Sequence, residues 1–407
     1  RSESNERDCT SDMELCFLGT ASCLPSLTRG VSSIALRSSG SGGSTCWLFD
    51  AGEGTQIQVQ KSWIRPSSID RIFITHLHGD HSFGIVGLMC LIGQDRPVEN
   101  GPLELYGPEG LRNMVRLTLQ LSRSRSVPPY RVNELRGVPY LHGNHGREPF
   151  SECDGLILPR DRRFKEVDDG LDIWPDEDGI WRVLHEDVDG MGVTAGPMQH
   201  TMPCVGYVLR EKQGSGRLKI DEVEKVVERN KEGLQREFGR SYKRVYKNIK
   251  ALQPGETFDL PDGTKLAYED VIVPARPGRK VVILGDTCDA GALLEEARGA
   301  DIVVHEATNA WIPGVDDKSA GEVQRDTISH GHSTPQMAGA FARAVGAQKL
   351  VLTHFSPRYR ADPSEFSRKC MSFIEEFARE ASGLAGAGVI AAHDLMSLQL
   401  ERPGYED

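Results

Sequence analysis

Short apolar runs and longer segments with helical periodicity alternate along the chain. Residues 13–50 contain three apolar runs separated by turns rich in Gly and Ser, which predicts a β-rich beginning. Four later runs, rich in β-branched residues or Leu, each end at or just before a His or an Asp. These four predicted strands cover residues 72–74, 281–284, 302–304 and 350–352.

Segments with helical periodicity lie between these predicted strands. Such an alternation is typical of an α/β domain, in which helices cover the faces of a sheet. If the four strands align, the His and Asp residues that follow them meet at one edge. The predicted helices cover residues 109–121, 290–298, 334–345 and 363–380.

The net charge of the 407-residue chain is −11, and one segment dominates it. Residues 151–190 carry 13 acidic and 5 basic residues, a net charge of −8, so the overall charge says little about what the remaining surface binds. We expect residues 144–190 to form an acidic surface insertion or a partly disordered loop. A solvated decoration without a function of its own is the favoured interpretation.

Composition excludes several classes of protein. With 38% hydrophobic and 26% charged residues, the chain is neither a disordered tail nor collagen-like. Its apolar runs are far shorter than the roughly 20 residues that span a bilayer, so we expect no membrane partner. Nine scattered Cys without a C-x-x-C pair favour a reducing intracellular compartment, such as the cytosol or nucleus. An organelle stays open, because the sequence begins with Arg1 and a targeting segment could have been removed.

The densest chemical signal is the segment 75–81, which follows a predicted strand and holds three His and one Asp. Imidazole and carboxylate groups are ligands for Zn²⁺ and similar ions, and an irregular loop can turn all four toward one point. Asp286, which follows another strand, is a natural bridging carboxylate. The expected ligands are His76, His78 and His200 for one ion and Asp80, His81 and His354 for the other, with Asp286 shared.

Such a ligand set predicts hydrolytic chemistry. Two ions roughly 3.5–4 Å apart can activate water and stabilise both the attacking and the leaving oxygen of a phosphodiester displacement. We expect two Zn²⁺ per subunit, although Mn²⁺ or Fe²⁺ suits the same ligands.

The order of these ligands, His-x-His-x-Asp-His followed by a distant His, Gly-Asp-Thr and a last His, resembles the metallo-β-lactamase superfamily. This resemblance implies an α/β fold of the four-layer αββα sandwich type. Further motifs resemble tRNase Z, the zinc-dependent endoribonuclease that removes the 3′ trailer of precursor tRNA. The resemblance implies a cut after the discriminator nucleotide that leaves a 3′-hydroxyl. These motifs lie at residues 17–20, 52–56, 278–280, 305–308 and 332–334.

The tRNase Z resemblance also implies roles beyond metal ligation. Glu306 and His332 would form a pair that helps to protonate the leaving ribose oxygen, while Asp80 would also orient the attacking water. The alternative role for His332 is to cap the helix that begins near residue 334. The residues expected to contact the substrate are Arg29, Ser356, Arg358 and Tyr359. Arg358 could instead be a structural surface charge.

In the short form of the family, an arm between the third ligand and the bridging Asp binds the tRNA elbow in trans across a homodimer. We place this RNA-binding arm at about residues 210–262, within which residues 221–250 have the pattern of a helix. Its rings, Phe238, Tyr242 and Tyr246, either pack beside RNA or face the core of an ordinary amphipathic helix. The basic residues expected to contact the tRNA backbone are Arg236, Arg240, Lys243, Arg244 and Lys247.

The sequence thus predicts one hydrolase domain over residues 13–402 that carries the acidic insertion and the arm, with tails at residues 1–12 and 403–407. Two alternatives for the function stay open. The first is a phosphodiesterase of the same fold that acts on small or cyclic phosphodiesters and needs no basic arm. The second is a non-catalytic RNA-binding protein, against which the complete ligand set argues, because unused buried charges are costly without metal.

Overall fold

The computed structural model describes residues 13–40, 43–141, 165–186, 190–213, 216–273 and 277–401. Within these residues the chain divides into two compact units. The larger unit comprises the described residues up to Glu211 and from Lys280 to Glu401, and the smaller unit comprises those from Lys212 to Arg279. Both predicted tails and residues 144–164 of the predicted insertion lie outside the described residues.

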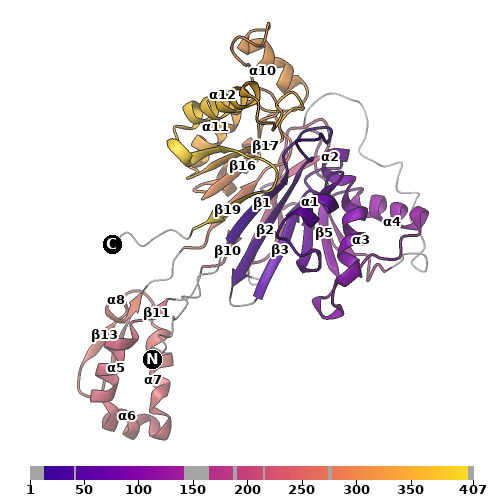
Figure 1. The fold of residues 1–407 in the computed structure, drawn as a ribbon. Coiled ribbons are helices and arrows are strands. Elements are labelled where there is room, and N and C mark those ends of the chain that lie inside the picture. Colours follow the sequence, from indigo (N-terminus) through magenta and orange to yellow (C-terminus); the bar gives the residue numbers. More distant parts are fainter. Residues whose placement is uncertain are drawn as a thin grey trace, which may run out of the picture. The chain divides into compact units, whose positions relative to one another are not determined.

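Two sheets and two layers of helices form the larger unit (Figure 1). In the described residues, the first sheet has eight strands in the order β19-β1-β2-β3-β4-β5-β6-β7. Its strands are β1 (Met13–Gly19), β2 (Ser33–Gly40), β3 (Gly43–Phe49), β4 (Ile69–Phe73), β5 (Leu103–Pro108), β6 (Tyr130–Leu135), β7 (Asp172–Ile173) and β19 (Met396–Leu400). The second sheet has seven described strands in the order β18-β17-β16-β15-β10-β9-β8. They are β8 (Trp181–Leu184), β9 (Met191–Met198), β10 (Cys204–Glu211), β15 (Lys280–Ile283), β16 (Ile302–Glu306), β17 (Leu350–Thr353) and β18 (Val389–Ala391).

Helices cover the outer face of each sheet. Those that follow strands of the first sheet are α1 (Thr55–Lys61), α2 (Gly79–Ser82), α3 (Ile85–Asp95) and α4 (Leu111–Ser122). Those that follow strands of the second sheet are α9 (Leu294–Ala297), α10 (Ala320–Ser329), α11 (Pro335–Val345) and α12 (Glu365–Ser382). Short 3₁₀ turns lie at Pro66–Ser68, Val98–Asn100, Gly291–Leu293 and Gly386–Gly388. No described helix has both the length and the apolar composition that a membrane crossing requires.

Three apolar clusters lie between the four layers of the described part of this unit. In β1, Leu15 faces the cluster between the two sheets, whereas Cys16 faces the cluster under α3 and α4. A third cluster joins Val303 of β16 to Ile374 of α12. Because both faces of β1 are covered, all of its residues are buried, and all are apolar or Gly except Glu14, which pairs with Arg37. The arrangement confirms the predicted αββα sandwich.

The strands that lead to the predicted ligands are parallel to one another. β15, β16 and β17 pair in parallel in the second sheet, and β3, β4 and β5 do so in the first. The carboxyl ends of parallel strands meet at one edge of a sheet, which is where open α/β sheets place their sites. The four strands predicted to end at a His or an Asp are β4, β15, β16 and β17, and each lies within a few residues of its predicted bounds.

The acidic segment is not a solvated decoration where the structure describes it. β7 joins the first sheet and β8 joins the second, so residues 172–184 pass from one sheet to the other. The prediction was wrong for this part because acidic residues here neutralise arginines of α4 and β6 and of the turn after β6. The carboxylates are Glu166, Asp168, Asp169 and Asp172, and the arginines are Arg112, Arg116, Arg131 and Arg136.

The smaller unit has a core of its own, which contains Val223, Val227, Leu234, Val245 and Ile249. Its helices are α5 (Ile220–Arg229), α6 (Lys231–Phe238), α7 (Val245–Lys250) and α8 (Tyr268–Val271), with a 3₁₀ segment at Gly239–Arg244. Two hairpin-like pairs complete it, β11 (Arg217–Leu218) with β14 (Ile272–Val273) and β12 (Thr257–Asp259) with β13 (Lys265–Ala267).

The predicted helix over residues 221–250 is broken in two places. α5 ends at Asn230, whose side chain bonds back to the Val226 carbonyl and accepts from the Asp262 N–H. The second break is at Gly239, which has a φ of 63° that ends α6. The bent chain turns Tyr242 into the core of the unit, with Phe238 and Tyr246 packed against it. The interpretation that the rings face a core is therefore confirmed.

The pair between Arg116 and Glu166 should be important for stability. The two side chains are 6% and 1% exposed, and the Nη2–Oε1 distance is 2.7 Å. Arg116→Met removes the arginine that pairs with this buried carboxylate, and breaking a buried pair in this way typically costs about 3–5 kcal/mol. We expect the free energy of unfolding, measured by urea denaturation, to fall by this order.

An exposed pair of the same type provides the control. Arg298 and Glu295 lie 2.6 Å apart with side chains 64% and 81% exposed. Arg298→Met should leave the urea midpoint nearly unchanged, because exposed pairs contribute little. Equal effects of the two substitutions would contradict a stabilising role for the acidic segment.

Candidate metal centre and active site

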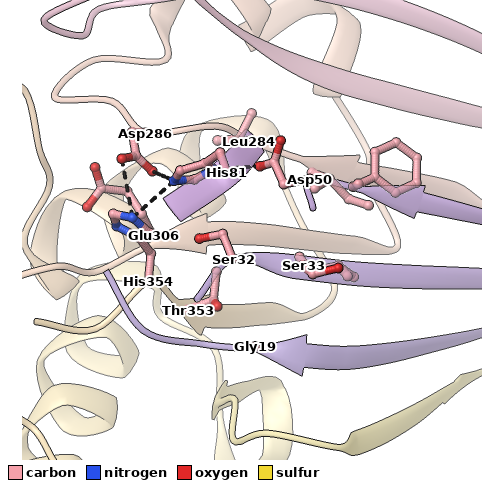
Figure 2. A pocket seen from close by; sticks show the side chains of 13 residues that line it. Gly19, Ser32, Ser33, Asp50, His81, Leu284, Asp286, Glu306, Thr353 and His354 are labelled. Atoms are coloured by element: carbon pink, nitrogen blue, oxygen red, sulfur yellow. Dashed lines mark hydrogen bonds and ion pairs between the residues drawn. The ribbon is translucent and has the colours of Figure 1, made fainter. Parts of the chain in front are cut away.

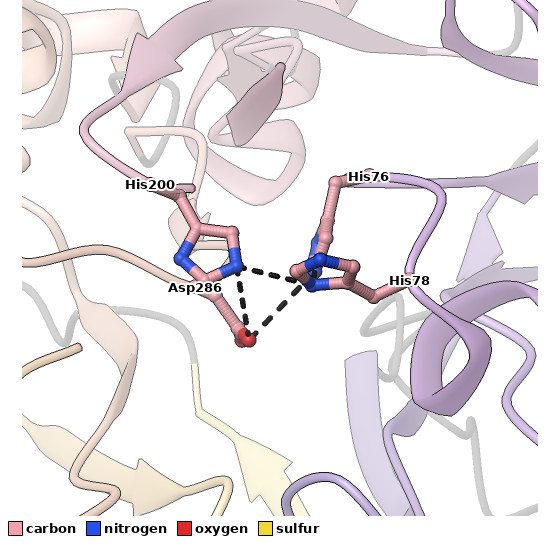
Figure 3. Close-up of side chains that lie close together, drawn as sticks. All are labelled: His76, His78, His200 and Asp286. Carbon is pink, nitrogen blue, oxygen red and sulfur yellow. Dashed lines mark hydrogen bonds and ion pairs between the residues drawn. The ribbon is translucent and has the colours of Figure 1, made fainter. Parts of the chain in front are cut away.

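The structure brings all seven predicted ligands together. His76, His78, His200 and Asp286 form one group whose possible ligand atoms lie within 4.8 Å of one another (Figure 3). Asp80, His81 and His354 form a second group by the same criterion. His76 and His78 belong to the loop after β4, while Asp80 and His81 lie in α2. The other three follow β9, β15 and β17: His200, Asp286 and His354.

The first group has the geometry of a cation site. The Nδ1 atom of His78 lies 3.1 Å from Nε2 of His76 and 3.2 Å from Nε2 of His200. Zinc–nitrogen bonds of about 2.0–2.1 Å in a tetrahedral site put two nitrogens ~3.3 Å apart, so these spacings fit a shared ion. Burial is the main cause that lowers the pKa of all three imidazoles, that of His200 to about 4. They are therefore neutral and can offer lone pairs to a metal.

The second group lies beside the first, and Asp286 of the first group contacts two of its members. Nε2 of His81 is 3.2 Å from Nε2 of His354, which in turn is 3.3 Å from Oδ2 of Asp80. Asp286 Oδ1 is 3.3 Å from His81 Nε2, and its Oδ2 is 3.3 Å from His354 Nε2 (Figure 2). The same Oδ2 is 3.7 Å from Nε2 of His76 in the first group. One carboxylate that faces both groups fits the predicted bridging role.

The donor set fits divalent metal chemistry. Imidazole and carboxylate ligands suit Zn²⁺, Mn²⁺ or Fe²⁺, and the carboxylate of Asp286 is only 2% exposed. Burial alone would raise the pKa of Asp286, but His354 and His81 hold it well below its usual range, so this group is an anion. A buried anion beside the neutral imidazoles of His76, His78 and His200 is a binding site for a cation.

Hydrogen bonds from behind fix the orientation of the imidazoles. Asp50 Oδ2 lies 2.7 Å from Nδ1 of His81, and Thr308 Oγ1 lies 2.9 Å from Nδ1 of His354. Nδ1 of His200 donates to the Gly331 carbonyl at 2.8 Å. Each contact leaves Nε2 free to face a metal, as such outer partners do in metalloproteins.

Sequence reasoning missed the roles of Asp50 and Thr308. Asp50 directly follows an apolar run, which is the same signal that marked the ligands. It has a φ of 62°, and His354 has a φ of 59°, a backbone region that is strained for residues other than Gly. Two residues at this centre are thus held by the surrounding structure in a conformation that costs energy.

Glu306 and His332 form the predicted pair. Oε1 of Glu306 lies 3.0 Å from Nδ1 of His332 and accepts from the Thr287 N–H at 2.9 Å. Burial would lower the pKa of His332, but Glu306 and then Asp286 raise it to about 9. α11 begins at Pro335 with Thr334 as its N-cap residue, so His332 is not the cap of that helix.

An open pocket of about 390 Å³ gives access to this centre. It is lined by ligands of both groups and by His332, and also by Cys23, Leu24 and Phe83. A second, smaller cavity of about 20 Å³ is lined by His81 and Asp286 among others (Figure 2). This cavity can hold one water, and the buried Ser33 hydroxyl in its wall has no hydrogen-bond partner among the described residues.

Two of the side chains predicted to contact the substrate are not accessible to solvent. Arg29 is 4% exposed, and its guanidinium donates to the carbonyls of Tyr359 and Ala392. Tyr359 is 1% exposed and bonds to the backbone of Ala310 through its hydroxyl. Neither side chain can reach a substrate in this conformation, because both tie the strand ends and loops together.

The other two predicted contacts are more accessible. Ser356 is half-buried, and the Arg358 side chain is 38% exposed. Arg358 pairs with Asp316 at 2.5 Å and lies over the ring of Tyr359. These contacts favour a structural role for Arg358 in this conformation, which was the alternative interpretation.

Comparison with known proteins decides the family. The family model described as the metallo-beta-lactamase superfamily matches residues 28–210. Zinc phosphodiesterase ELAC protein 1 of Mus musculus is 36% identical over 371 residues, which cover 88% of this chain and 89% of that protein. Ribonuclease Z of Streptococcus sanguinis is 33% identical over 365 residues, covering 89% and 96% respectively. The chain belongs to the ribonuclease Z family.

Solved structures agree with membership in the ribonuclease Z family. The crystal structure of human tRNase Z, short form, is 29% identical and has a TM-score of 0.56, with 96% of this chain and 99% of that one covered. A long form RNase Z from yeast, 18% identical with a TM-score of 0.52, shares the fold; the match covers 97% of this chain and 42% of that one. As a member of this family, the protein is a metal-dependent hydrolase, which excludes the non-catalytic alternative.

The carboxylate behind His81 provides a test of the metal centre. Asp50→Asn keeps the size of the side chain but removes the charge that orients His81. Loss of such an outer partner typically costs 10- to 100-fold in metal affinity. We expect a loss of that size in zinc affinity, measured by competition with a chromophoric chelator. Asp317→Asn, at an exposed position, should leave the affinity unchanged, and equal affinities of the two variants would contradict the role of Asp50.

Proposed function

We propose that this protein is the endoribonuclease that removes the 3′ trailer of precursor tRNA, cutting just after the discriminator nucleotide and leaving a 3′-hydroxyl. The observation that carries this proposal is the placement of Glu306 and His332 beside two ligand groups that share Asp286. Relatives named ribonuclease Z, similar over most of the chain, support it.

The two ligand groups would hold two divalent ions, with Zn²⁺ favoured by the names of the relatives. When bound, such ions activate a water molecule and offset the charge that develops on the phosphate oxygens. Residues of the protein position the attacking water. Asp80 is fixed by the Cys23 N–H, which donates to its Oδ2 at 2.6 Å, and it lines the pocket. There it can orient the attacking water.

His332 supplies the proton for the leaving group. The water gives up one proton to the solvent as its oxygen forms the new bond to phosphorus, and the bond between phosphorus and the ribose O3′ breaks. His332 then gives its proton to O3′, which becomes the 3′-hydroxyl, and the 5′-phosphate stays on the trailer. Glu306 keeps the imidazole protonated and oriented through the 3.0 Å contact at Nδ1. Its other oxygen is held by the Thr308 N–H and hydroxyl.

The smaller unit would bind the body of the tRNA. Its core takes up the aromatic rings and leaves the predicted basic side chains on the surface. These exposed cations suit phosphate contacts, which read the shape and backbone of RNA more than its bases. We propose that the unit acts in trans within a homodimer. The exposed basic residues are Arg236, Arg240, Lys243, Arg244 and Lys247.

The acid role of His332 predicts a dependence on the leaving group. His332→Gln should lower the rate of trailer cleavage by about 10²- to 10⁴-fold, because general acids typically contribute this much. The hydrolysis of bis(p-nitrophenyl) phosphate should fall less, since p-nitrophenolate leaves without a proton. Both rates are measured on enzyme with verified metal content.

His330→Gln is the matched control, because His330 lies two residues away and its side chain is 71% exposed. It should leave both rates unchanged. Equal losses of His332→Gln on RNA and on the nitrophenyl ester would contradict the acid role.

The proposed RNA contacts predict a change in salt dependence. Replacing Lys243, Arg244 and Lys247 by Glu should weaken precursor tRNA binding and reduce the slope of log K against log salt by about 2, since each phosphate contact contributes ~0.7–0.9. Binding is measured by fluorescence anisotropy at several salt concentrations. Hydrolysis of the nitrophenyl ester should be unaffected.

Charge reversal elsewhere controls for the general effect of added negative charge. Arg368 and Lys369 are exposed on α12 of the larger unit. Their replacement by Glu should change the salt slope less than the reversals in the smaller unit. The same slope for both variants would argue against the smaller unit as the RNA-binding arm.

A further inference from the structure

Phe83 is an exposed aromatic side chain at the metal centre that the mechanism does not use. It follows α2 directly, and 69% of it is exposed to solvent. Its side chain lines the open pocket that also contains Asp80 and His332. An exposed ring beside the reacting groups has a face available to a ligand.

The backbone on both sides of Phe83 is fixed, and the ring packs on one side against Gly79. A Cβ at Gly79 would lie 2.4 Å from Cε2 of the ring, so the ring packs directly over that glycine. The Phe83 N–H donates to the Gly79 carbonyl at 3.0 Å, and the Gly84 N–H donates to the Ala51 carbonyl at 2.8 Å. A Cβ at Gly84 would lie 2.0 Å from the Gly52 carbonyl oxygen, so this position is also closely packed. A ring mounted in this way loses little entropy when a ligand binds.

We infer that Phe83 is a stacking platform for a nucleobase next to the scissile phosphate. This inference rests on the proposed function. A phosphate held between the ligand groups carries a nucleoside on either side, and an aromatic face in the same pocket suits its base. Base–aromatic stacking tolerates any sequence, as an enzyme with many precursor substrates requires. Leu24, 62% exposed, lines the same pocket and adds apolar surface.

The test combines protein variants with abasic substrates. Phe83→Leu removes the aromatic face and keeps an apolar side chain, and Phe83→Tyr keeps the face. The substrates are a precursor tRNA and two versions of it with an abasic site just before or just after the cut. The measured quantity is kcat/KM. Phe366→Leu is the matched control, because Phe366 on α12 is 53% exposed and does not line the pocket.

Stacking predicts a specific pattern. Phe83→Leu should lower kcat/KM on the intact precursor by roughly 5- to 100-fold, and Phe83→Tyr should retain it. The kcat/KM of the wild type should be lower by a similar factor on one of the two abasic substrates. On that substrate, Phe83→Leu should not lower kcat/KM further. Metal content should be the same in all variants.

Three results would overturn the inference. The first is a loss no larger than that of Phe366→Leu. The second is a loss that stays undiminished on both abasic substrates, which would mean that the ring acts on the fold. The third is a change in oligomeric state, which would place the ring in an interface. If the wild-type protein leaves the precursor uncut, the proposed function itself is contradicted. This outcome differs from the three above, in which the wild type cuts the precursor.

Discussion

The buried carboxylate of Asp286 is the constraint on which the rest of the site depends. It is 2% exposed and lies within 3.8 Å of imidazole nitrogens from both ligand groups. An anion at such a depth is costly unless cations or hydrogen-bond donors surround it. The structure meets this need with five imidazoles that have a nitrogen within 3.8 Å of this carboxylate and that come from segments far apart in sequence.

The fold explains how these groups arrive at one point. Parallel strands in each of the two sheets end at the site, and the loops after them carry the ligands. Asp50, Glu306 and Thr308 form a further layer that orients the imidazoles from behind. The αββα architecture therefore supplies a rigid frame, while the chemistry lies in the loops at its edge.

Sequence reasoning found the parts whose signal is local. The ligands in residues 75–81 are dense and follow a strand, and Asp286 and His354 follow strands of the same kind, so the structure brings together what that pattern predicted. Burial was harder to foresee. Arg29 and Tyr359 belong to motifs that resemble the family, but a motif does not show whether a side chain is buried. Arg29 donates to the Tyr359 carbonyl, which lies more than 300 residues away in sequence, and such a contact cannot be read from either motif.

Long-range pairing accounts for the other differences. The acidic residues 166–172 read as a solvated segment because their arginine partners lie 36 to 60 residues away on α4, on β6 and in the turn after β6. In the smaller unit, periodicity indicated a helix, but Asn230 and Gly239 end two short helices whose rings share a core. Patterns in a single sequence describe each segment by itself, whereas these differences depend on the distant residues with which each segment pairs or packs.

The cut site in an end-labelled precursor tRNA with a 3′ trailer tests the central claim most directly. Zinc-loaded protein should make one cut, just after the discriminator nucleotide, and leave a 3′-hydroxyl, and Asp286→Asn should abolish it. An intact trailer, in a sample that binds two ions and hydrolyses bis(p-nitrophenyl) phosphate, would contradict the account and favour a small-phosphodiester substrate.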